Sequence, residues 1–216
     1  MISRVTSGLY AGKEIDYFST VRKDITCLVP DGPNTVLDVG CGAGGTLLEL
    51  KESGKARETV GVDIVDLKPR GLDNFLHQNI EDTVLPYRNG YFDVIICADV
   101  LEHLYDPWGT VGKLAGYLKK GGILIASVPN IQEIRTLLTI LLGGDFRYAD
   151  AGILDRTHLR FFCKKNIIGL IGQAGLEVKA IHYRKSNWKR LFLDAITFGL
   201  IKDMLVGQYV MVAGKR

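Results

Sequence analysis

Short apolar runs recur along the chain from residue 35 onward, and stretches with helical periodicity separate them. Several runs are apolar almost throughout instead of at every second position, which is typical of strands that are covered on both faces. Alternation of such strands with helices predicts an α/β fold in which helices cover both faces of a mostly parallel sheet. The seven expected strands are TVLDVG at 35, ETVGVDI at 58, FLHQNI at 75, YFDVIICAD at 91, GGILIASVPN at 121, LEVKAIHYR at 176 and GQYVMVAGKR at 207.

Two stretches interrupt this alternation, residues 131–163 and residues 185–206. No internal repeat, low-complexity tract or linker rich in Pro, Gly and Ser divides the chain, so a single domain over residues 1–216 is predicted. Insertions that follow strand ends commonly meet the ligand of an open α/β sheet. We therefore expect both stretches to act as lid or substrate-binding segments.

The composition is that of an ordinary globular protein, with 216 residues, 47% hydrophobic and 24% charged. The 27 basic and 24 acidic residues include no basic block, so nucleic acid is not an expected partner. Four widely spaced cysteines without a CxxC pair favour reduced thiols in a cytoplasmic protein over a zinc site or a disulfide framework. No apolar stretch has the composition of a signal peptide or a transmembrane segment.

A glycine-rich loop follows the first expected strand in VLDVGCGAGG, residues 36–45. Gly40, Gly42 and the next two glycines allow a tight turn and close approach of the backbone to a ligand at a helix N-terminus. Read with Gly45 the loop matches GxGxxG, which also fits a dinucleotide-binding fold. Asp38 distinguishes a dinucleotide from a cationic amino-acid ligand, because its carboxylate would repel a pyrophosphate but suits an ammonium group. The charge favours S-adenosylmethionine over NAD.

Polar residues at the ends of the next two strands suggest how an adenosine could be held. Asp63 ends the second strand, 19 residues after Gly44, where an acid can bind the two ribose hydroxyls. A helix N-cap or a solvated loop carboxylate is the alternative. After the third strand, Asn79, Ile80 and Glu81 offer apolar and polar groups to an adenine, although such residues are common in ordinary loops.

Five motifs together resemble the seven-stranded, Rossmann-like class of S-adenosylmethionine-dependent methyltransferases, over Tyr17 to Lys215. They are VLDVGCGAGG, GVDI, LPYRNGYFDVIICADVLEHLYDPW, LKKGGILIASVPN and GILDRTHLRFF. The resemblance implies a sheet with an antiparallel last strand and S-adenosylhomocysteine as product. DVLEHL, SVPN and LDRTHLRFF further resemble small-molecule methyltransferases found beside glycosyltransferases, which implies a small-molecule or glycan acceptor. An NAD-dependent oxidoreductase and a non-catalytic cofactor-binding scaffold are the alternatives.

The resemblance also implies the roles of individual residues. Asp38, Gly40, Cys41 and Gly42 would line the methionine end, and Ala98 would offer its backbone to the ammonium. Asp63 would hold the ribose, Ile64 would flank the adenine, and further adenine contacts would come from Asn79, Ile80 and Glu81. Many relatives carry Asp where this chain has Asn79, which can form a hydrogen bond but brings no charge.

ADVLEHL places Asp99, Glu102 and His103 beside the expected methyl group. An imidazole with its reference pKa of roughly 6.5 could act as general base on an acceptor hydroxyl. Alternatively, His103 packs on the cofactor or caps a helix. Ubiquinone-pathway O-methyltransferases have a similar acid-x-x-Glu-His pattern that holds a divalent ion, and these three residues match it. Asp99 is shorter than the Glu of that pattern and reaches less far. Metal binding is therefore the alternative, and the main prediction is that no metal is bound.

GILDRTHLRFF, residues 152–162, places ionisable side chains among apolar ones, and burying such groups costs several kcal/mol each without partners. In the related enzymes this segment folds over the cofactor site, so we expect it to form a site wall, with His158 a second catalytic candidate. An ion-pair network that only fastens the segment is the alternative. Asp155 and Thr157 are expected to cap the helix that begins near Lys164.

Two further expectations concern the remaining segments. Tyr17 and Arg22 would come from a helix over the cofactor pocket, where Arg22 would meet the methionine carboxylate unless it is a surface arginine. Residues 188–207 form an amphipathic stretch that is expected to pack on its own domain or on a second subunit, which allows a homodimer. Its mixed charge makes a membrane surface the less favoured partner.

Overall fold

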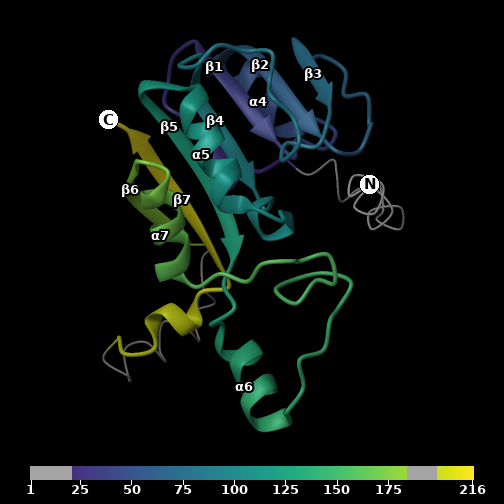
Figure 1. Cartoon of the computed structure of the whole chain (residues 1–216), viewed down its shortest axis with the longest axis vertical. Coiled ribbons are helices and arrows are strands. Elements are labelled where there is room, and N and C mark those ends of the chain that lie inside the picture. The colour runs from purple at the N-terminus through teal and green to yellow at the C-terminus, as the bar shows by residue number, and fades with distance from the viewer. Residues whose placement is uncertain (1–20, 184–198) are drawn as a thin grey trace.

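Seven strands of the described chain form one sheet in the order β3-β2-β1-β4-β5-β7-β6 (Figure 1). The structure is a computed structural model that describes residues 21–183 and 199–216. Only β7 runs antiparallel to its neighbours β5 and β6, so the predicted α/β sheet with an antiparallel last strand is confirmed. The strands are β1 Asn34–Val39, β2 Ala56–Asp63, β3 Asn74–His77, β4 Phe92–Ala98, β5 Leu118–Pro129, β6 Leu176–Tyr183 and β7 Gln208–Lys215.

Helices cover both faces of the sheet, as the apolar strand runs predict. The described helices are α3 Lys23–Thr26, α4 Gly45–Glu52, α5 Pro107–Tyr117, α6 Ile134–Gly143 and α7 Lys164–Gln173, with 3-10 turns η1 Leu101–His103 and η2 Lys202–Leu205. Successive residues of β1 point to opposite faces, so Val36 packs in a core with α3 and α4, and Leu37 packs in a second core with α5 and α7.

Local sequence explains where the helices near the sheet edge begin. Gly40 and Gly44 adopt positive φ angles of 72° and 80°, and a Cβ at Gly40 would lie 2.5 Å from Val100 Cγ2. α5 begins with Pro107 after Asp106, whose side chain accepts a hydrogen bond from the Gly109 amide at 3.0 Å. The two turns fix the backbone at the carboxyl ends of β1 and β4.

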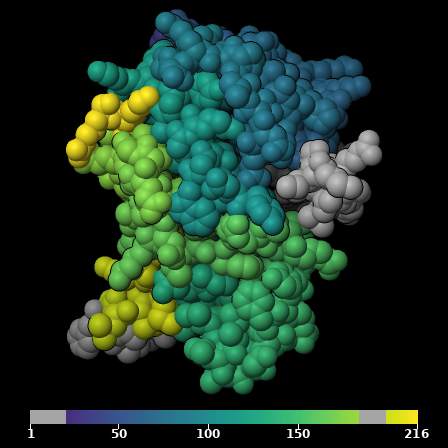
Figure 2. All heavy atoms as spheres, in the orientation of Figure 1, coloured from purple at the N-terminus to yellow at the C-terminus, as the bar shows by residue number. Residues whose placement is uncertain are grey.

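The 131–163 segment leaves the sheet edge after β5 and returns to it before α7 (Figure 1). Its helix α6 has no buried residue and, with the loop that follows, occupies the lower right of the molecule in Figure 2. The returning part of this segment packs on η1, because the amides of Leu159 and Arg160 both donate to the Glu102 carbonyl, at 2.8 and 2.9 Å. This insertion therefore contacts the sheet at the same edge as the glycine loop.

Of the second expected insertion, only residues 199–206 lie within the described chain, and they contain η2. Asn130 ties them to β5, since its side-chain amide donates to the carbonyls of Asp203 and Val206 at 2.8 Å. Tyr17, residues 185–198 and most of the amphipathic stretch lie outside the described residues. Across 21–183 and 199–216, no helix combines the length and apolarity that a membrane crossing requires.

Candidate functional site

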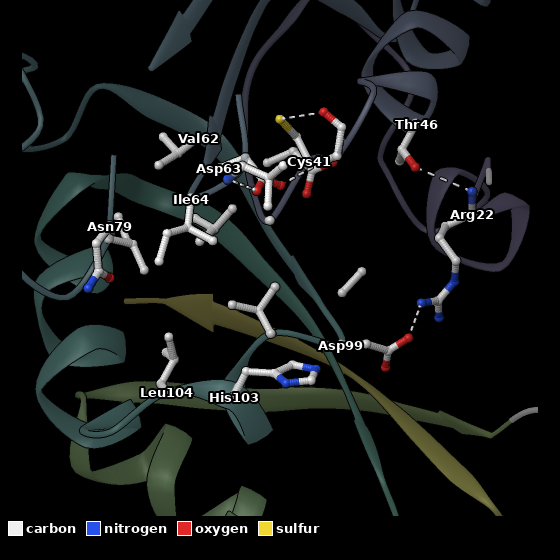
Figure 3. A pocket seen from close by; sticks show the side chains of 18 of the residues that line it. Arg22, Cys41, Thr46, Val62, Asp63, Ile64, Asn79, Asp99, His103 and Leu104 are labelled. Carbon is white, nitrogen blue, oxygen red and sulfur yellow. Dashed lines mark hydrogen bonds and ion pairs between the residues drawn. The ribbon is translucent and has the colours of Figure 1, made fainter. Parts of the chain in front are cut away.

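A cavity of about 660 Å³ opens at the carboxyl ends of β1, β2 and β4 (Figure 3). All ten residues expected to hold the cofactor line it: Asp38, Gly40, Cys41, Gly42, Asp63, Ile64, Asn79, Ile80, Glu81 and Ala98. They meet because the carboxyl ends of parallel strands share one sheet edge, which is where open α/β sheets bind ligands. We call this space the first cavity.

Asp63 is held at the wall of the first cavity by the glycine loop. Its Oδ2 accepts a hydrogen bond from the Gly42 amide and its Oδ1 accepts one from the Val65 amide, both at 2.8 Å. Burial raises the pKa of this carboxyl, although the backbone donors act in the opposite direction. A carboxylate oxygen has further lone pairs, so Asp63 retains acceptor capacity toward a ligand.

Asp38 is the most strongly perturbed acid of the first cavity. It is 4% exposed, and its burial, together with the nearby charge of Asp63, raises its pKa to about 8. The neighbouring Cys41 thiol also has a raised pKa because it is buried. A Cβ on Gly61 would lie 2.6 Å from this sulfur, so the thiol fills the space behind the loop. The two buried acids make a cationic ligand group favourable here.

The loop after β3 closes one side of the first cavity with groups that already have partners. The Asn79 side-chain oxygen accepts from the Glu81 amide at 3.0 Å, and its nitrogen donates to Asp82 at 2.9 Å. Glu81 accepts from the Asp106 amide at 2.6 Å, which joins this loop to the start of α5. Asn79 and Glu81 therefore shape the wall, and the buried Ile80 contributes its apolar surface.

A second cavity of about 650 Å³ lies beside the first, and Asp99 and His103 line both. Its walls come from η1, the ends of β5 and β7, and the 131–163 segment. They are Asp99, Glu102, His103, Pro129, Glu133, Arg135, Ala151, Gly152, Ile153, Asp155, His158, Gly207 and Gln208. These described residues include four carboxyl groups and one guanidinium, so the second cavity favours cationic or hydrogen-bond-donating ligands.

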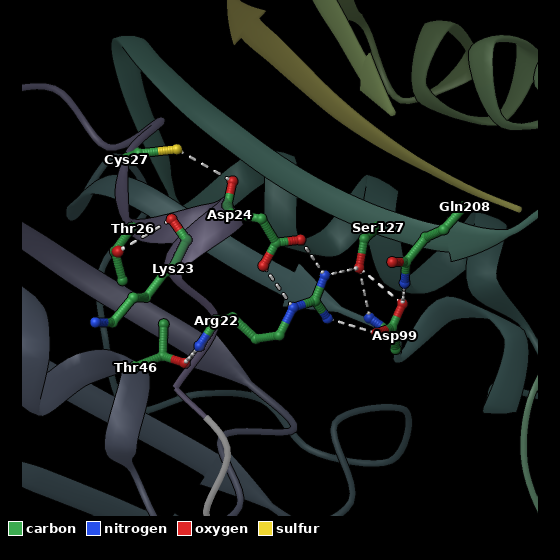
Figure 4. Close-up of polar contacts among 9 residues, drawn as sticks. All are labelled: Arg22, Lys23, Asp24, Thr26, Cys27, Thr46, Asp99, Ser127 and Gln208. Atoms are coloured by element: carbon green, nitrogen blue, oxygen red, sulfur yellow. Dashed lines mark hydrogen bonds and ion pairs between the residues drawn. The ribbon is translucent and has the colours of Figure 1, made fainter. Parts of the chain in front are cut away.

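Asp99 is engaged by three donors from distant parts of the chain (Figure 4). Arg22 forms an ion pair with it at 2.5 Å, and Ser127 and Gln208 donate to its other oxygen at 2.8 and 2.5 Å. Arg22 also pairs with Asp24 at 2.8 Å, so its guanidinium lies between two carboxylates. Arg22 lines the first cavity, as the sequence suggests, but acidic residues of this chain already hold its charge.

This network bears on the alternative metal site. A guanidinium and two further donors occupy the Asp99 carboxylate, which leaves it poorly suited as a metal ligand. The set Asp99, Glu102 and His103 therefore does not fit a divalent ion in this structure. One ligand atom each of Glu102, His103 and His158 lies within 4.8 Å of the other two.

The two histidines come from segments far apart in the sequence and pack edge to face, with ring centroids 4.8 Å apart. Nδ1 of His103 lies 3.0 Å from the Thr157 carbonyl, and Nδ1 of His158 lies 2.9 Å from the Ile153 carbonyl. Burial and the neighbouring His158 lower the pKa of His103 to about 4. The reference pKa of roughly 6.5, on which the expected role of His103 as a general base depends, is therefore wrong for this residue.

Some ionisable side chains of GILDRTHLRFF line the second cavity, and others lie at the surface. Asp155 and His158 are buried and line the cavity, whereas Arg156 pairs with the exposed Asp150 at 2.6 Å. The Arg160 guanidinium lies over the rings of Tyr105 and Trp108, at 5.7 and 5.9 Å from their centroids.

The expected capping role of this segment is wrong. α7 has Cys163 as N-cap, with Asn166 accepting from its amide at 3.2 Å. Asp155 instead accepts from the amide and hydroxyl of Thr157 at 2.9 and 2.7 Å, and so closes its own turn. The aspartate lies too early in the chain to reach the amides of α7.

Sequence reasoning missed Glu133 and Gln208, which line the second cavity, and Ser127, which donates a hydrogen bond to Asp99. Glu133 is buried and caps α6, accepting from the amides of Arg135 and Thr136 at 2.9 and 3.1 Å. Gln208 begins β7, which brings it beside the carboxyl end of β5 because β7 runs antiparallel. The expected antiparallel direction of the last strand could have identified Gln208, because the first residue of such a strand lies at the sheet edge where the parallel strands end.

A model of the family described as "Methyltransferase domain" matches residues 14–181. A ubiquinone biosynthesis O-methyltransferase of Xylella fastidiosa is 35% identical over 145 residues, which cover 61% of this chain and 55% of that protein. The enzyme of the same name from Aromatoleum aromaticum is 29% identical over 152 residues, 66% of this chain and 63% of that protein. The chain thus spans less than two thirds of these relatives.

Solved structures with the same fold have lower identity. A SAM-dependent methyltransferase from Archaeoglobus fulgidus superposes with a TM-score of 0.68 at 18% identity, covering 93% of this chain and 97% of that one. An N1-methyltransferase from Burkholderia thailandensis, solved with 1,6-didemethyltoxoflavin and S-adenosylhomocysteine bound, has a TM-score of 0.65 at 15% identity, covering 99% and 86%. These similarities establish the fold.

Proposed function

The chain belongs to the methyltransferase domain family, and on this premise we propose that it transfers the methyl group of S-adenosylmethionine to an oxygen, or a nitrogen, of a small-molecule or glycan acceptor. The observation that carries the proposal is the pair of adjoining cavities with Asp99 and His103 in both linings. A methyl transfer needs such an arrangement, because donor and acceptor must meet in line at the sulfonium methyl.

The cofactor would occupy the first cavity. Asp38 would face the methionine ammonium, next to backbone from Gly40 to Gly42 and at Ala98. Asp63 would accept hydrogen bonds from the ribose hydroxyls, while Ile64 and Ile80 flank the adenine. The buried carboxyl of Asp38 beside the glycine loop supports this cofactor over NAD, whose pyrophosphate would have to approach it.

The acceptor would occupy the second cavity, with its reacting atom near His103. The sulfonium charge of the cofactor supplies most of the driving force, so the protein must align the acceptor, exclude water and assist loss of a proton. We assign that assistance to His103 and His158. The Nδ1 of each imidazole faces a backbone carbonyl, which can only accept, so each neutral ring carries its lone pair on Nε2.

Oxygen is the first acceptor atom to test, because the relatives named above are O-methyltransferases. The acidic second cavity suits a hydroxyl donor such as a phenol or a sugar hydroxyl. A homodimer and a cytoplasmic location remain predictions of the sequence.

Calorimetry and a methyl-transfer assay test the proposal in two steps. S-adenosylhomocysteine should bind to the full chain and NAD should not; the opposite result would indicate an oxidoreductase. Incubation with methyl-labelled S-adenosylmethionine and a panel of phenols, sugars and amines should then label at least one acceptor. Binding of the cofactor without label transfer to any acceptor class would favour a scaffold.

A further inference from the structure

Three side chains converge where η1 meets the 131–163 segment, and we infer that Glu102, His103 and His158 bind one divalent transition-metal ion. The third ligand is His158 of the 131–163 segment, in place of the Asp99 that the Asp-x-x-Glu-His resemblance implies. The inference deepens the proposed function and rests on it for the role of the ion, but the ion site itself can be tested alone.

Glu102 is the first observation that points to a missing ligand. It is 1% exposed, and neither of its carboxylate oxygens accepts a hydrogen bond from another described residue. Burying a carboxylate without a partner costs several kcal/mol. For this reason buried charges in proteins are normally paired or coordinate metals. Glu102 also lines the second cavity, so an ion could reach it.

The histidines supply the second observation. A metal-bound histidine usually donates its other ring N–H to a carbonyl or carboxylate, which fixes the tautomer and the ring orientation. The Thr157 and Ile153 carbonyls meet this requirement at 3.0 and 2.9 Å. Both rings therefore direct a lone-pair nitrogen away from their backbone partners, as a pair of metal ligands needs.

The spacing of the three groups fits an ion after a small adjustment. One ligand atom from each lies within 4.8 Å of the other two. Ligands of a tetrahedral ion with bonds of about 2.1 Å lie about 3.4 Å apart, so shifts of about 1 Å per side chain would close the site. Two imidazoles and one carboxylate suit Zn²⁺, Mn²⁺, Fe²⁺ or Co²⁺, whereas Mg²⁺ and Ca²⁺ prefer oxygen ligands.

Asp99 is excluded from the ligand set by its contacts. Arg22, Ser127 and Gln208 donate to both of its oxygens. Arg22 balances the negative charge of Asp99, whereas the carboxylates of Asp155 and Glu133 also line the second cavity and favour a cation there. The ion would occupy the Nε2 lone pairs of both histidines, so in the metal-bound protein it would assist loss of the acceptor proton as a Lewis acid in place of the imidazoles. It would also tie the 131–163 segment to η1.

Titration of the chelator-treated full chain with Zn²⁺, by calorimetry, and with Co²⁺, by visible absorption, tests the inference. Wild-type protein should bind about one ion, and His158→Ala or Glu102→Gln should weaken binding by roughly 100-fold or more. Asp99→Asn should bind within about threefold of wild type, and so should His182→Ala, which removes an exposed histidine on β6 as a matched control.

Absence of Zn²⁺ binding by the wild type would overturn the inference, and so would loss of binding in Asp99→Asn with retention in His158→Ala. Thermal unfolding without metal identifies any variant that fails to fold, and the near-isosteric Glu102→Gln provides a second test of the ligand set. S-adenosylhomocysteine is titrated into the same samples. Cofactor binding without Zn²⁺ binding would refute the ion site alone, whereas failure of the wild type to bind the cofactor would refute the proposed function.

Discussion

Binding of S-adenosylhomocysteine should expel a proton from Asp38. Burial and the charge of Asp63 raise the pKa of this carboxyl to about 8 in the ligand-free protein. At pH 7 it is therefore about 90% protonated. In the complex the ligand ammonium would lie beside it, and an opposite charge at such a distance lowers a carboxyl pKa. The complex should hold the ionised form, with release of about 0.9 proton per ligand at pH 7.

The same shift sets the pH dependence of affinity and stability. Affinity for S-adenosylhomocysteine should rise about tenfold per pH unit from pH 6 and level off above pH 8. Because the folded pKa of Asp38 lies above its unfolded value of 3.8, the stability of the ligand-free protein should fall as the pH rises from 3.8 to about 8. A shift of about four units corresponds to about 5 kcal/mol once the carboxyl is fully ionised.

Calorimetry in two buffers measures the proton directly. At pH 7 the binding enthalpy is compared in phosphate and in Tris, whose ionisation enthalpies differ, and the slope gives the number of protons released. Asp38→Asn should abolish the slope, while Asp66→Asn, an exposed acid just beyond the cavity wall, should retain it. A wild-type slope of zero would mean that Asp38 is already ionised or does not face the ammonium. An unchanged slope in Asp38→Asn would assign the proton to another group.

Four further outcomes are expected. Asp63→Ala should weaken S-adenosylhomocysteine binding by about 2–4 kcal/mol through loss of the ribose hydrogen bonds; equal affinities in calorimetry would refute the ribose assignment. Glu102→Gln should raise the melting temperature of the metal-free protein at pH 8 more than at pH 5, because burial raises the carboxyl pKa and only the ionised form is costly; fluorimetry showing the same difference at both pH values would contradict this. His103→Ala should lower turnover roughly 100-fold with cofactor binding retained, and wild-type turnover at saturating cofactor should persist to about pH 5 since the His103 pKa is about 4; a pH profile of the turnover number at saturating cofactor that falls near pH 6.5 would disagree. Gly40→Ala should lose cofactor affinity because its Cβ would lie 2.5 Å from Val100 Cγ2 at φ 72°, whereas the exposed helical Gly112→Ala, with nothing within 4 Å, should bind normally; equal binding by both would show that the loop tolerates a side chain.

The sequence by itself determined the sheet and the residues of the first cavity. Strand runs such as TVLDVG are apolar on both faces, and this pattern is local, so it can be recognised without contacts. Once the strands are parallel, their carboxyl ends must share one edge. The residues that end β1, β2 and β4, from Asp38 to Ala98, therefore meet at the first cavity whatever the details of packing. The glycine loop is equally local, because positive φ and close approach require glycine.

The tertiary structure alone decided how the second cavity is built. The contact of His103 with Thr157 joins residues 54 positions apart, and no periodicity in the chain specifies it. The pKa of His103 follows from burial and from the neighbouring His158, so the residue type predicted the wrong value. Asp99 matches a metal-binding pattern in sequence, but the fold brings Arg22 and Gln208 to its carboxylate and His158 to the other two residues of the pattern. Partners, burial and charge depend on long-range packing, and they determine which of several possible ligands a side chain can bind.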